Sequence, residues 1–140
     1  MHKKIKIILD TNWWISFIVS KNSFGFPVFF FDKKMLICFS EELKNEIISS
    51  LAYTRTLKRI NPVNLEMYNT YITYSAKIFS VKTFVNLCRD PKDNFLLALA
   101  KDASADFLIT RDEDLLSLKR FENTSIVTLP QFLEIINKLS

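Results

Sequence analysis

The stretch IKIILDTNWWIS, residues 5–16, places a carboxylate at the end of an apolar run and then continues into two tryptophans. Residues 5–9 are rich in β-branched side chains, as expected for a short buried strand, and residues 12–19 are expected to form the helix that follows. An unpaired charge between two buried elements costs free energy. Asp10 therefore needs a partner, and other acidic residues of the chain indicate what that partner is.

The composition of the chain excludes several classes of protein. With 140 residues and no repeat, linker or low-complexity tract, residues 1–140 are expected to form a single domain with its own core. Hydrophobic residues make up 49%, which excludes a disordered chain, and a lone glycine excludes the glycine-rich loops that bind phosphates. The net charge of +4 favours a polyanionic partner only mildly.

The cellular location is predicted from what the sequence lacks. Its apolar runs are too short for a membrane span, and Asp10 interrupts the N-terminal run, so no membrane partner and no signal peptide are expected. Cys38 and Cys88 stand alone, which favours reduced thiols. The sequence therefore predicts a cytoplasmic protein.

Strand patterns alternate with helix patterns along the rest of the chain. After residues 5–9, strands are predicted at residues 35–39, 82–88, 106–110 and 125–129. Helices are predicted at residues 41–52, 62–79, 93–103, 114–118 and 130–139, with Ser40 as one N-cap and Pro62 and Pro130 in first turns. The phenylalanine-rich residues 24–31 are expected in the core. The alternation predicts an α/β fold with a central, mainly parallel sheet flanked by helices.

Four acidic residues occupy the ends or faces of these elements. Asp10 and Asp112 follow predicted strands, Asp93 begins a predicted helix, and Glu46 projects from the helix at residues 41–52. The carboxyl ends of parallel strands line the crevice in which such sheets bind ligands. Glu46 and Glu41 lie at opposite edges of the apolar stripe of their helix, so periodicity alone does not choose between them.

Converging carboxylates would repel one another and raise their own pKa values, and a divalent cation removes that penalty. Ligands that are all oxygen select Mg²⁺ or Mn²⁺ over zinc. His2 is the only histidine and lies near the N-terminus, which excludes a histidine-rich zinc site and a Ser-His-Asp triad. An all-carboxylate metal site suits in-line phosphoryl chemistry, in which one acid can also accept a proton from the attacking water.

Each of these residues also has a plainer interpretation. Asp10, Asp93 and Asp112 taken singly are typical N-caps, and Glu46 alone is typical of a solvated helix face. Trp13 and Trp14 are expected in the core rather than as platforms for base stacking. Basic residues that could contact an RNA backbone, or simply be solvated, are Lys3, Lys4, Lys6, Arg55, Lys58 and Arg59.

The chain resembles the PIN-domain nucleases, in particular the toxins of bacterial toxin–antitoxin pairs. Four segments carry the resemblance: IILDTNWWIS (7–16), CFSEELKNEIISSL (38–51), CRDPKDNFLLALA (88–100) and ADFLITRDEDLLSL (105–118). Trp13-Trp14 and the scarcity of glycine depart from the usual pattern, but neither affects an acidic position.

The resemblance implies a three-layer PIN-like sandwich and Mg²⁺- or Mn²⁺-dependent cleavage of RNA. It also implies a small antitoxin partner and a homodimer. It assigns the catalytic, metal-binding acids to Asp10, Glu46, Asp93 and Asp112. Further residues that it implies are Asp114 as a ligand and Asp90, Asn12 and Thr110 as supports.

Two other functions fit parts of the pattern. A PIN-like module without turnover would bind RNA or a protein partner and release no products. A receiver-like domain would accept a phosphoryl group on a strand-end aspartate, but it requires a lysine at a late strand end, where this sequence has Pro130.

Overall fold

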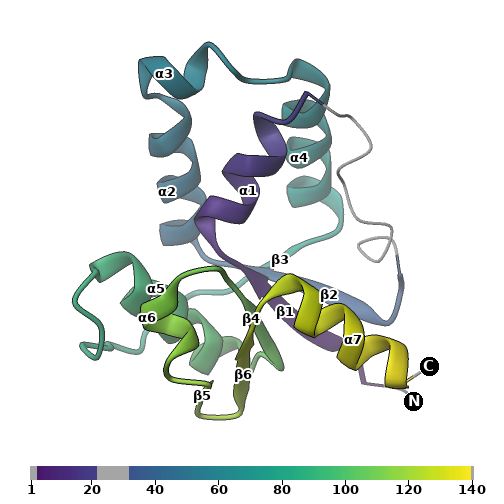
Figure 1. Cartoon of the computed structure of the whole chain (residues 1–140), viewed down its shortest axis with the longest axis vertical. Coiled ribbons are helices and arrows are strands. Elements are labelled where there is room, and N and C mark those ends of the chain that lie inside the picture. The colour runs from purple at the N-terminus through teal and green to yellow at the C-terminus, as the bar shows by residue number, and fades with distance from the viewer. Residues whose placement is uncertain (1–2, 22–31, 140) are drawn as a thin grey trace.

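The computed structural model describes residues 3–21 and 32–139, so the predicted core segment 24–31 lies outside the described residues. Figure 1 shows the arrangement of the elements. The strands are β1 (Ile5–Leu9), β2 (Met35–Phe39), β3 (Lys77–Ile78), β4 (Phe107–Ile109), β5 (Arg120–Phe121) and β6 (Thr124–Val127). The helices are α1 (Thr11–Ile18), α2 (Glu41–Leu51), α3 (Thr54–Leu57), α4 (Pro62–Tyr74), α5 (Pro91–Ala103), α6 (Glu113–Leu116) and α7 (Leu129–Leu139).

Within the described residues the strands form one six-stranded sheet in the order β3-β2-β1-β4-β6-β5. All neighbours are parallel except β5 and β6, which pair antiparallel at the edge. Ile7 of β1 is in register with Ile37 on one side and with Phe107 on the other. The predicted α/β fold with a mainly parallel central sheet is confirmed.

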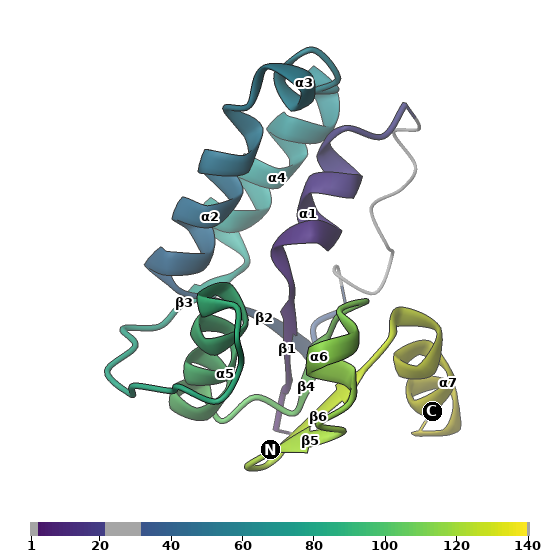
Figure 2. The same cartoon turned by 60° about the vertical axis from the view of Figure 1, so that its left-hand side comes forward.

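Helices cover both faces of the sheet and extend beyond one end of it. Figure 2 shows α5 and α7 on opposite sides of the strands, where α5 contacts β1, β2 and β4 and α7 contacts β4. Helices α1, α2 and α4 form a separate group beyond the carboxyl ends of β1 and β2, with α1 in contact with both of the others (Figures 1 and 2). The carboxyl ends of β1 and β2 therefore have α1, α2 and α4 beyond them, and α5 and α7 cover the two faces of the sheet.

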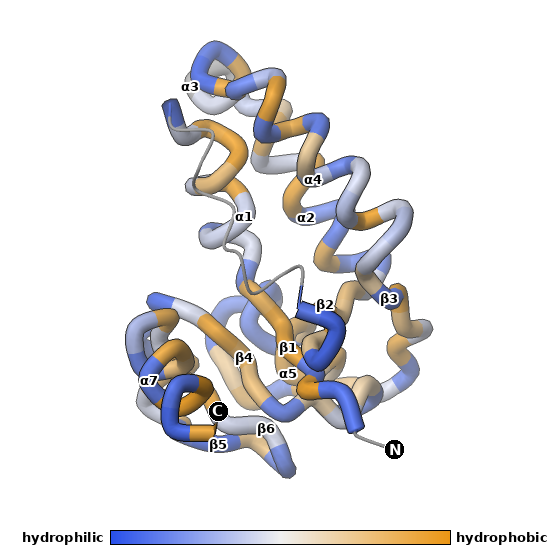
Figure 3. The backbone as a smooth tube through the Cα atoms, turned by 90° about the vertical axis from the view of Figure 1, so that its right-hand side faces the viewer, coloured by the Kyte–Doolittle hydropathy of each residue, from blue (hydrophilic) through white to orange (hydrophobic). Residues whose placement is uncertain are grey.

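The core is centred on β1 and on the first turns of α1. Ile7, Ile8 and Leu9 are fully buried, and Figure 3 shows β1 and β4 as apolar segments. The Trp14 ring is also fully buried, with its centroid 5.3 Å from that of Phe39. The prediction of a core position is confirmed for Trp14, whereas Trp13 is half-buried.

The predicted helix starts follow from local hydrogen bonds. Ser40 caps α2 through its Oγ, which accepts a hydrogen bond from the Leu43 backbone N–H at 3.2 Å. Asn61 caps α4, and Pro62 occupies the first turn, where the absence of an N–H costs nothing. The Ser40 cap and the first-turn position of Pro62 were predicted correctly from the sequence.

The strand predicted at residues 82–88 is wrong. Side chains of α5 bind this segment instead: the Asp102 carboxylate accepts hydrogen bonds from the Lys82 and Thr83 backbone N–H groups. The Asn94 amide oxygen likewise accepts from Leu87 and Cys88. Because these side chains satisfy the backbone, the segment has no need of a strand neighbour.

Several helix boundaries also differ from the prediction, most of all the end of α4. The helix that begins at Pro62 ends at Tyr74 rather than near residue 79, because Lys77–Ile78 form β3 beside Cys38 and Phe39 of β2. Helix α5 begins at Pro91 rather than at residue 93. No helix within residues 3–21 and 32–139 is long and apolar enough to cross a membrane.

Candidate metal centre

Two of the predicted acids lie at the same end of the sheet because their strands are neighbours. Leu9 and Ile109 are paired at the carboxyl ends of β1 and β4, and the backbone N–H of Asp10 donates to the Ile109 carbonyl at 3.2 Å. Asp10 follows β1 directly, and Asp112 follows β4 after two residues. This pairing places both residues at the edge predicted to bind a ligand.

Asp10 is buried, and hydrogen bonds engage both of its carboxylate oxygens. Its Oδ1 accepts from the Trp13 backbone N–H at 2.8 Å, which makes Asp10 the N-cap of α1. Its Oδ2 accepts from the Thr110 hydroxyl at 2.5 Å, and that hydroxyl oxygen accepts in turn from the Asp112 backbone N–H at 3.0 Å. Both oxygens of this buried side chain therefore have hydrogen-bond partners within the fold.

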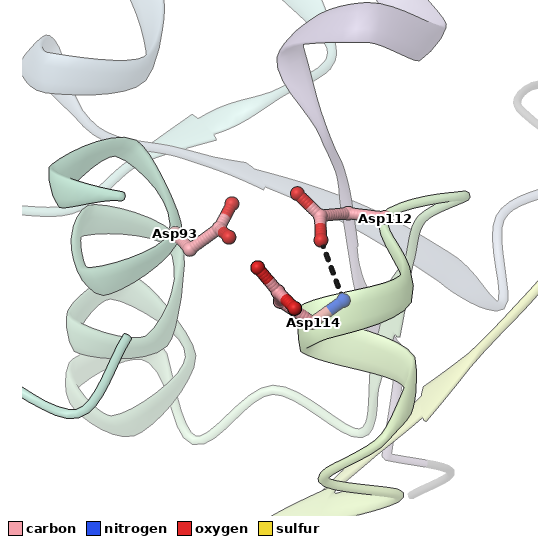
Figure 4. Close-up of side chains that lie close together, drawn as sticks. All are labelled: Asp93, Asp112 and Asp114. Carbon is pink, nitrogen blue, oxygen red and sulfur yellow. Dashed lines mark hydrogen bonds between the residues drawn. The ribbon is translucent and has the colours of Figure 1, made fainter. Parts of the chain in front are cut away.

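Asp112 combines an N-cap with a place in a cluster of acids. Its Oδ1 accepts from the Asp114 backbone N–H at 2.8 Å, as Figure 4 shows. The same oxygen accepts from the Leu115 backbone N–H at 3.4 Å, at the start of α6. The N-cap interpretation therefore holds for Asp10 and Asp112. It fails for Asp93, because Asp90 caps α5 by accepting from the Lys92 backbone N–H.

The acidic cluster consists of Asp93, Asp112 and Asp114. Each offers one carboxylate oxygen, and these atoms all lie within 4.8 Å of one another. Figure 4 shows Asp93 pointing from α5 toward the two acids at the start of α6. Asp93 is only 5% exposed, and its Oδ2 has no hydrogen-bond partner among the described residues.

Burial and neighbouring charge both act on Asp93. Burial, together with the adjacent Asp112 and, less strongly, Asp90 and Asp114, raises the pKa of Asp93 from 3.8 to about 7. Within the described part of the chain, the cation paired with the cluster is Arg89, whose exposed guanidinium lies 3.5 Å from Asp114 Oδ2. The buried carboxylate thus lacks direct compensation, and a donor set made only of oxygens fits Mg²⁺ or Mn²⁺.

A polar cleft of about 110 Å³ connects the cluster to other predicted residues. It is lined by Asp10, Thr11, Asn12, Ser50, Asp90, Lys92, Asp93, Leu96 and Asp112. Asn12 and Asp90, predicted as supports, are therefore at the site. Sequence reasoning missed Ser50 and Lys92. The sequence could have indicated Lys92, because it is next to Asp93. It could also have indicated Ser50, because Ser50 lies one helical turn after Glu46.

Glu46 lies beside the cleft rather than within the three-acid cluster. Its Oε1 lies 2.8 Å from Lys92 Nζ, and this hydrogen bond raises the pKa of Lys92. Glu41, the alternative on the same helix, is exposed and lies 3.9 Å from Lys44. Of the two glutamates, Glu46 is thus the one connected to the acidic cleft, through Lys92.

The basic residues differ in what the structure shows. Lys58 and Arg59 are exposed just after α3, while the side chain of Arg55 lies outside the described residues. Arg111, which sequence reasoning also missed, is exposed immediately before Asp112 and donates from Nη2 to Ser16 Oγ at 3.1 Å. Its place between two residues of the Thr-x-Asp segment was the signal that could have identified it.

Comparison with known proteins agrees with this geometry. An uncharacterized protein of Methanocaldococcus jannaschii, MJ1680, is 29% identical over 120 residues, which cover 83% of this chain and 76% of that relative. The model of the PIN domain family matches residues 6–114, a range that contains every acid of the cleft and of the cluster. Because the match spans well over half of the chain, this protein belongs to the PIN domain family.

Proposed function

We propose that this protein is a metal-dependent endoribonuclease in which Asp93, Asp112 and Asp114 hold one or two Mg²⁺ or Mn²⁺ ions. The observation that carries the proposal is the buried Asp93 carboxylate: its Oδ2 has no hydrogen-bond partner among the described residues, and one of its oxygens lies within 4.8 Å of an oxygen of Asp112 and of Asp114. PIN domains are generally nucleases, which makes a phosphodiester the expected substrate. We also propose that residues 1–140 act as one domain.

The remaining predicted acids have supporting places. Asp10 is held by Thr110 and by the first turn of α1, so it sets the negative potential of the cleft and fixes the position of the Asp112 backbone. Glu46 enters the ligand set when Lys92 releases it, because the two side chains meet at the cleft wall. When bound, the metal ion supplies activation of water and stabilisation of charge on the leaving oxygen.

The substrate side of the cleft needs positive charge, because the acids repel phosphates. Lys92 lines the cleft itself and Arg111 precedes Asp112, so these two residues can neutralise phosphates next to the cluster. Lys58, Arg59 and Arg55 follow α2 and are proposed as more distant backbone contacts. Arg and Lys contacts of this kind position RNA without reading its sequence.

The test is cleavage of a mixed single-stranded RNA with Mn²⁺, with Mg²⁺ and with chelator. Asp93→Asn and Asp112→Asn should abolish cleavage, whereas Glu113→Gln should retain it, because Glu113 is exposed on α6 and lies outside the three-acid cluster. Circular dichroism of each variant checks the fold. Full metal-dependent activity in Asp93→Asn would contradict the assignment.

The alternative of a module without turnover is favoured by one observation. In this structure Asp10 has both oxygens engaged and Glu46 is paired with Lys92, so two of the four predicted acids already have partners. That function predicts RNA binding without products under every metal condition. Gel-shift measurements beside the cleavage assay separate the two possibilities.

A toxin role, a small antitoxin partner and a homodimer are proposed from the resemblance of the four segments alone. Expression in a bacterial host should arrest growth only if the metal site is intact, with Asp93→Asn as the inactive control. Light scattering of the purified protein measures whether it is dimeric. Growth that is equal for both proteins would refute the toxin role but leave the nuclease proposal intact.

A further inference from the structure

A second cavity also has Asp10 in its lining but contains none of the three clustered acids. Its volume is about 370 Å³, compared with about 110 Å³ for the acidic cleft, and Asp10 lines both. It is formed where α1, the carboxyl end of β4 and the first turn of α7 meet, elements that Figure 1 shows close together. The size falls within the range of small-molecule pockets.

The walls of this cavity combine apolar surface with a few polar groups. Among the residues that the structure describes, the apolar ones in the lining are Trp13, Phe17, Ile109, Leu129 and Pro130, and the polar ones are Asp10, Ser16, Ser20, Thr110 and Arg111. The Trp13 and Phe17 rings are nearly parallel, 14° apart with centroids separated by 6.1 Å. Flat apolar walls with polar groups beside them suit a heteroaromatic ring that carries hydrogen-bonding atoms on its edge.

Arg111 gives the cavity a charge opposite to that of the acidic cleft. Its guanidinium donates to Ser16 Oγ, across the space between β4 and α1, and the side chain is exposed. A planar guanidinium binds a phosphate in a bidentate fashion and keeps its charge at any physiological pH. The cavity therefore has apolar walls and a phosphate-binding group, which are the two parts that a nucleotide requires.

We propose that this cavity binds one unpaired nucleobase of the RNA strand next to the bond that is cut, with Arg111 contacting that nucleotide's phosphate. The proposal rests on the nuclease function in identifying the ligand as RNA. Asp10, which lines both cavities, and Thr110, whose hydroxyl donates to Asp10, support the position, because they place the cavity beside the end of the sheet that carries the acids. Single-stranded RNA is recognised by this kind of base insertion.

The experiment uses the four nucleoside 5′-monophosphates as probes, in chelator, so that neither metal nor cleavage contributes. Nitrogen-15 spectra report the indole N–H of Trp13 in the cavity, and that of Trp14, which does not line it, serves as the internal reference. Ser16→Phe fills the cavity from an exposed helix position. Arg111→Gln is matched by Arg120→Gln, because Arg120 is likewise exposed and donates to a serine hydroxyl, that of Ser125 at 3.4 Å.

At least one monophosphate should shift the Trp13 signal in a saturable way. Ser16→Phe and Arg111→Gln should each weaken that binding by about tenfold, the size of one lost base or phosphate contact. Arg120→Gln should bind as the unaltered protein does. Absence of any Trp13 shift with all four probes, or equal binding by folded Ser16→Phe, would overturn the proposal.

The outcome is separable from that of the nuclease proposal. If RNA is cleaved, Ser16→Phe should raise KM for single-stranded RNA while the metal requirement stays the same. If no RNA is cleaved but monophosphates still bind in a way that depends on Ser16 and Arg111, the nucleotide pocket stands and the nuclease assignment falls. Cleavage with an unchanged KM in Ser16→Phe would overturn the pocket alone.

Discussion

Replacing Asp93 by Asn should stabilise the metal-free protein, although the residue is buried and belongs to the proposed active site. Asn keeps the shape of the side chain and cannot ionise. In the unaltered protein, Oδ2 of this carboxylate has no hydrogen-bond partner among residues 3–21 and 32–139, and the carboxylate faces Asp112 and Asp114. Removing its charge therefore removes repulsion and a desolvation cost.

The pH dependence follows from the raised pKa. The pKa of Asp93 is about 7 in the folded protein and 3.8 without the fold, so between these values the folded state binds more protons. Its contribution makes stability fall as pH rises from about 4 to about 7 and stay low above that. At about 1.4 kcal/mol per pKa unit, the raised pKa lowers the free energy of unfolding above pH 7 by about 4 kcal/mol. This value is an upper limit, because the repulsion acts on the neighbouring carboxylates as well as on Asp93.

Urea unfolding in chelator, followed by tryptophan fluorescence at pH 5 and at pH 8, measures the effect. The gain in the free energy of unfolding of Asp93→Asn should be clearly larger at pH 8 than at pH 5. Asp102→Asn is the matched control, because hydrogen bonds from Thr83 and Lys82 lower the pKa of Asp102. That variant should lose stability equally at pH 5 and pH 8, since Asp102 is ionised in the folded and the unfolded state at both.

Bound metal should reverse the order of stability of the unaltered protein and Asp93→Asn. An ion that binds only the folded state adds about 2.7 kcal/mol at one hundred times its Kd. Mn²⁺ or Mg²⁺ should therefore stabilise the unaltered protein and leave Asp93→Asn nearly unchanged. The reasoning is refuted if Asp93→Asn is equally destabilised at both pH values in chelator, because Asp93 would then be a structural residue that the fold already satisfies.

Two further variants test the groups around the cluster. Lys92→Met should lower the free energy of unfolding by less than about 1 kcal/mol, as for exposed ion pairs. It should tighten Mn²⁺ binding about threefold, because Glu46 is no longer paired with Lys92. Calorimetry measures the binding, and weaker Mn²⁺ binding would show that Lys92 orders the site instead. Thr110→Val should cost about 1–3 kcal/mol in denaturant unfolding, because it leaves a buried oxygen of Asp10 without its partner, and it should also weaken metal binding by releasing the Asp112 backbone. A Thr110→Val protein of unchanged stability would mean that water replaces the hydroxyl.

Local chemistry made much of the fold predictable. Ser40, Asn61 and Pro62 start their helices through side-chain hydrogen bonds or a fixed backbone angle, effects that depend only on near neighbours. Alternation of strands and helices then implied a parallel sheet. The segment at residues 82–88 was predicted wrongly, because it has the composition of a strand but is bound by side chains of the helix that follows it, Asn94 and Asp102.

For the site, the sequence by itself determined the chemical class. It has one glycine and one histidine, so phosphate loops and histidine-rich metal sites were excluded, and acids at strand ends predicted a site with oxygen ligands only. Only the tertiary structure decided which acids meet. In the folded protein Asp93, Asp112 and Asp114 lie together, Asp10 accepts a hydrogen bond from Thr110, and Glu46 is paired with Lys92.

The physical reason for this difference is the sequence separation over which the interactions act. Caps, strand patterns and excluded chemistries depend on residue type and on spacing of a few residues, which the sequence contains in full. The distance between Asp93 and Asp112 depends on how α5 packs against the sheet, and the cavity beside Asp10 depends on where α7 crosses the end of β4. Such positions result from the packing of the whole core, so they become known only when every element is in place.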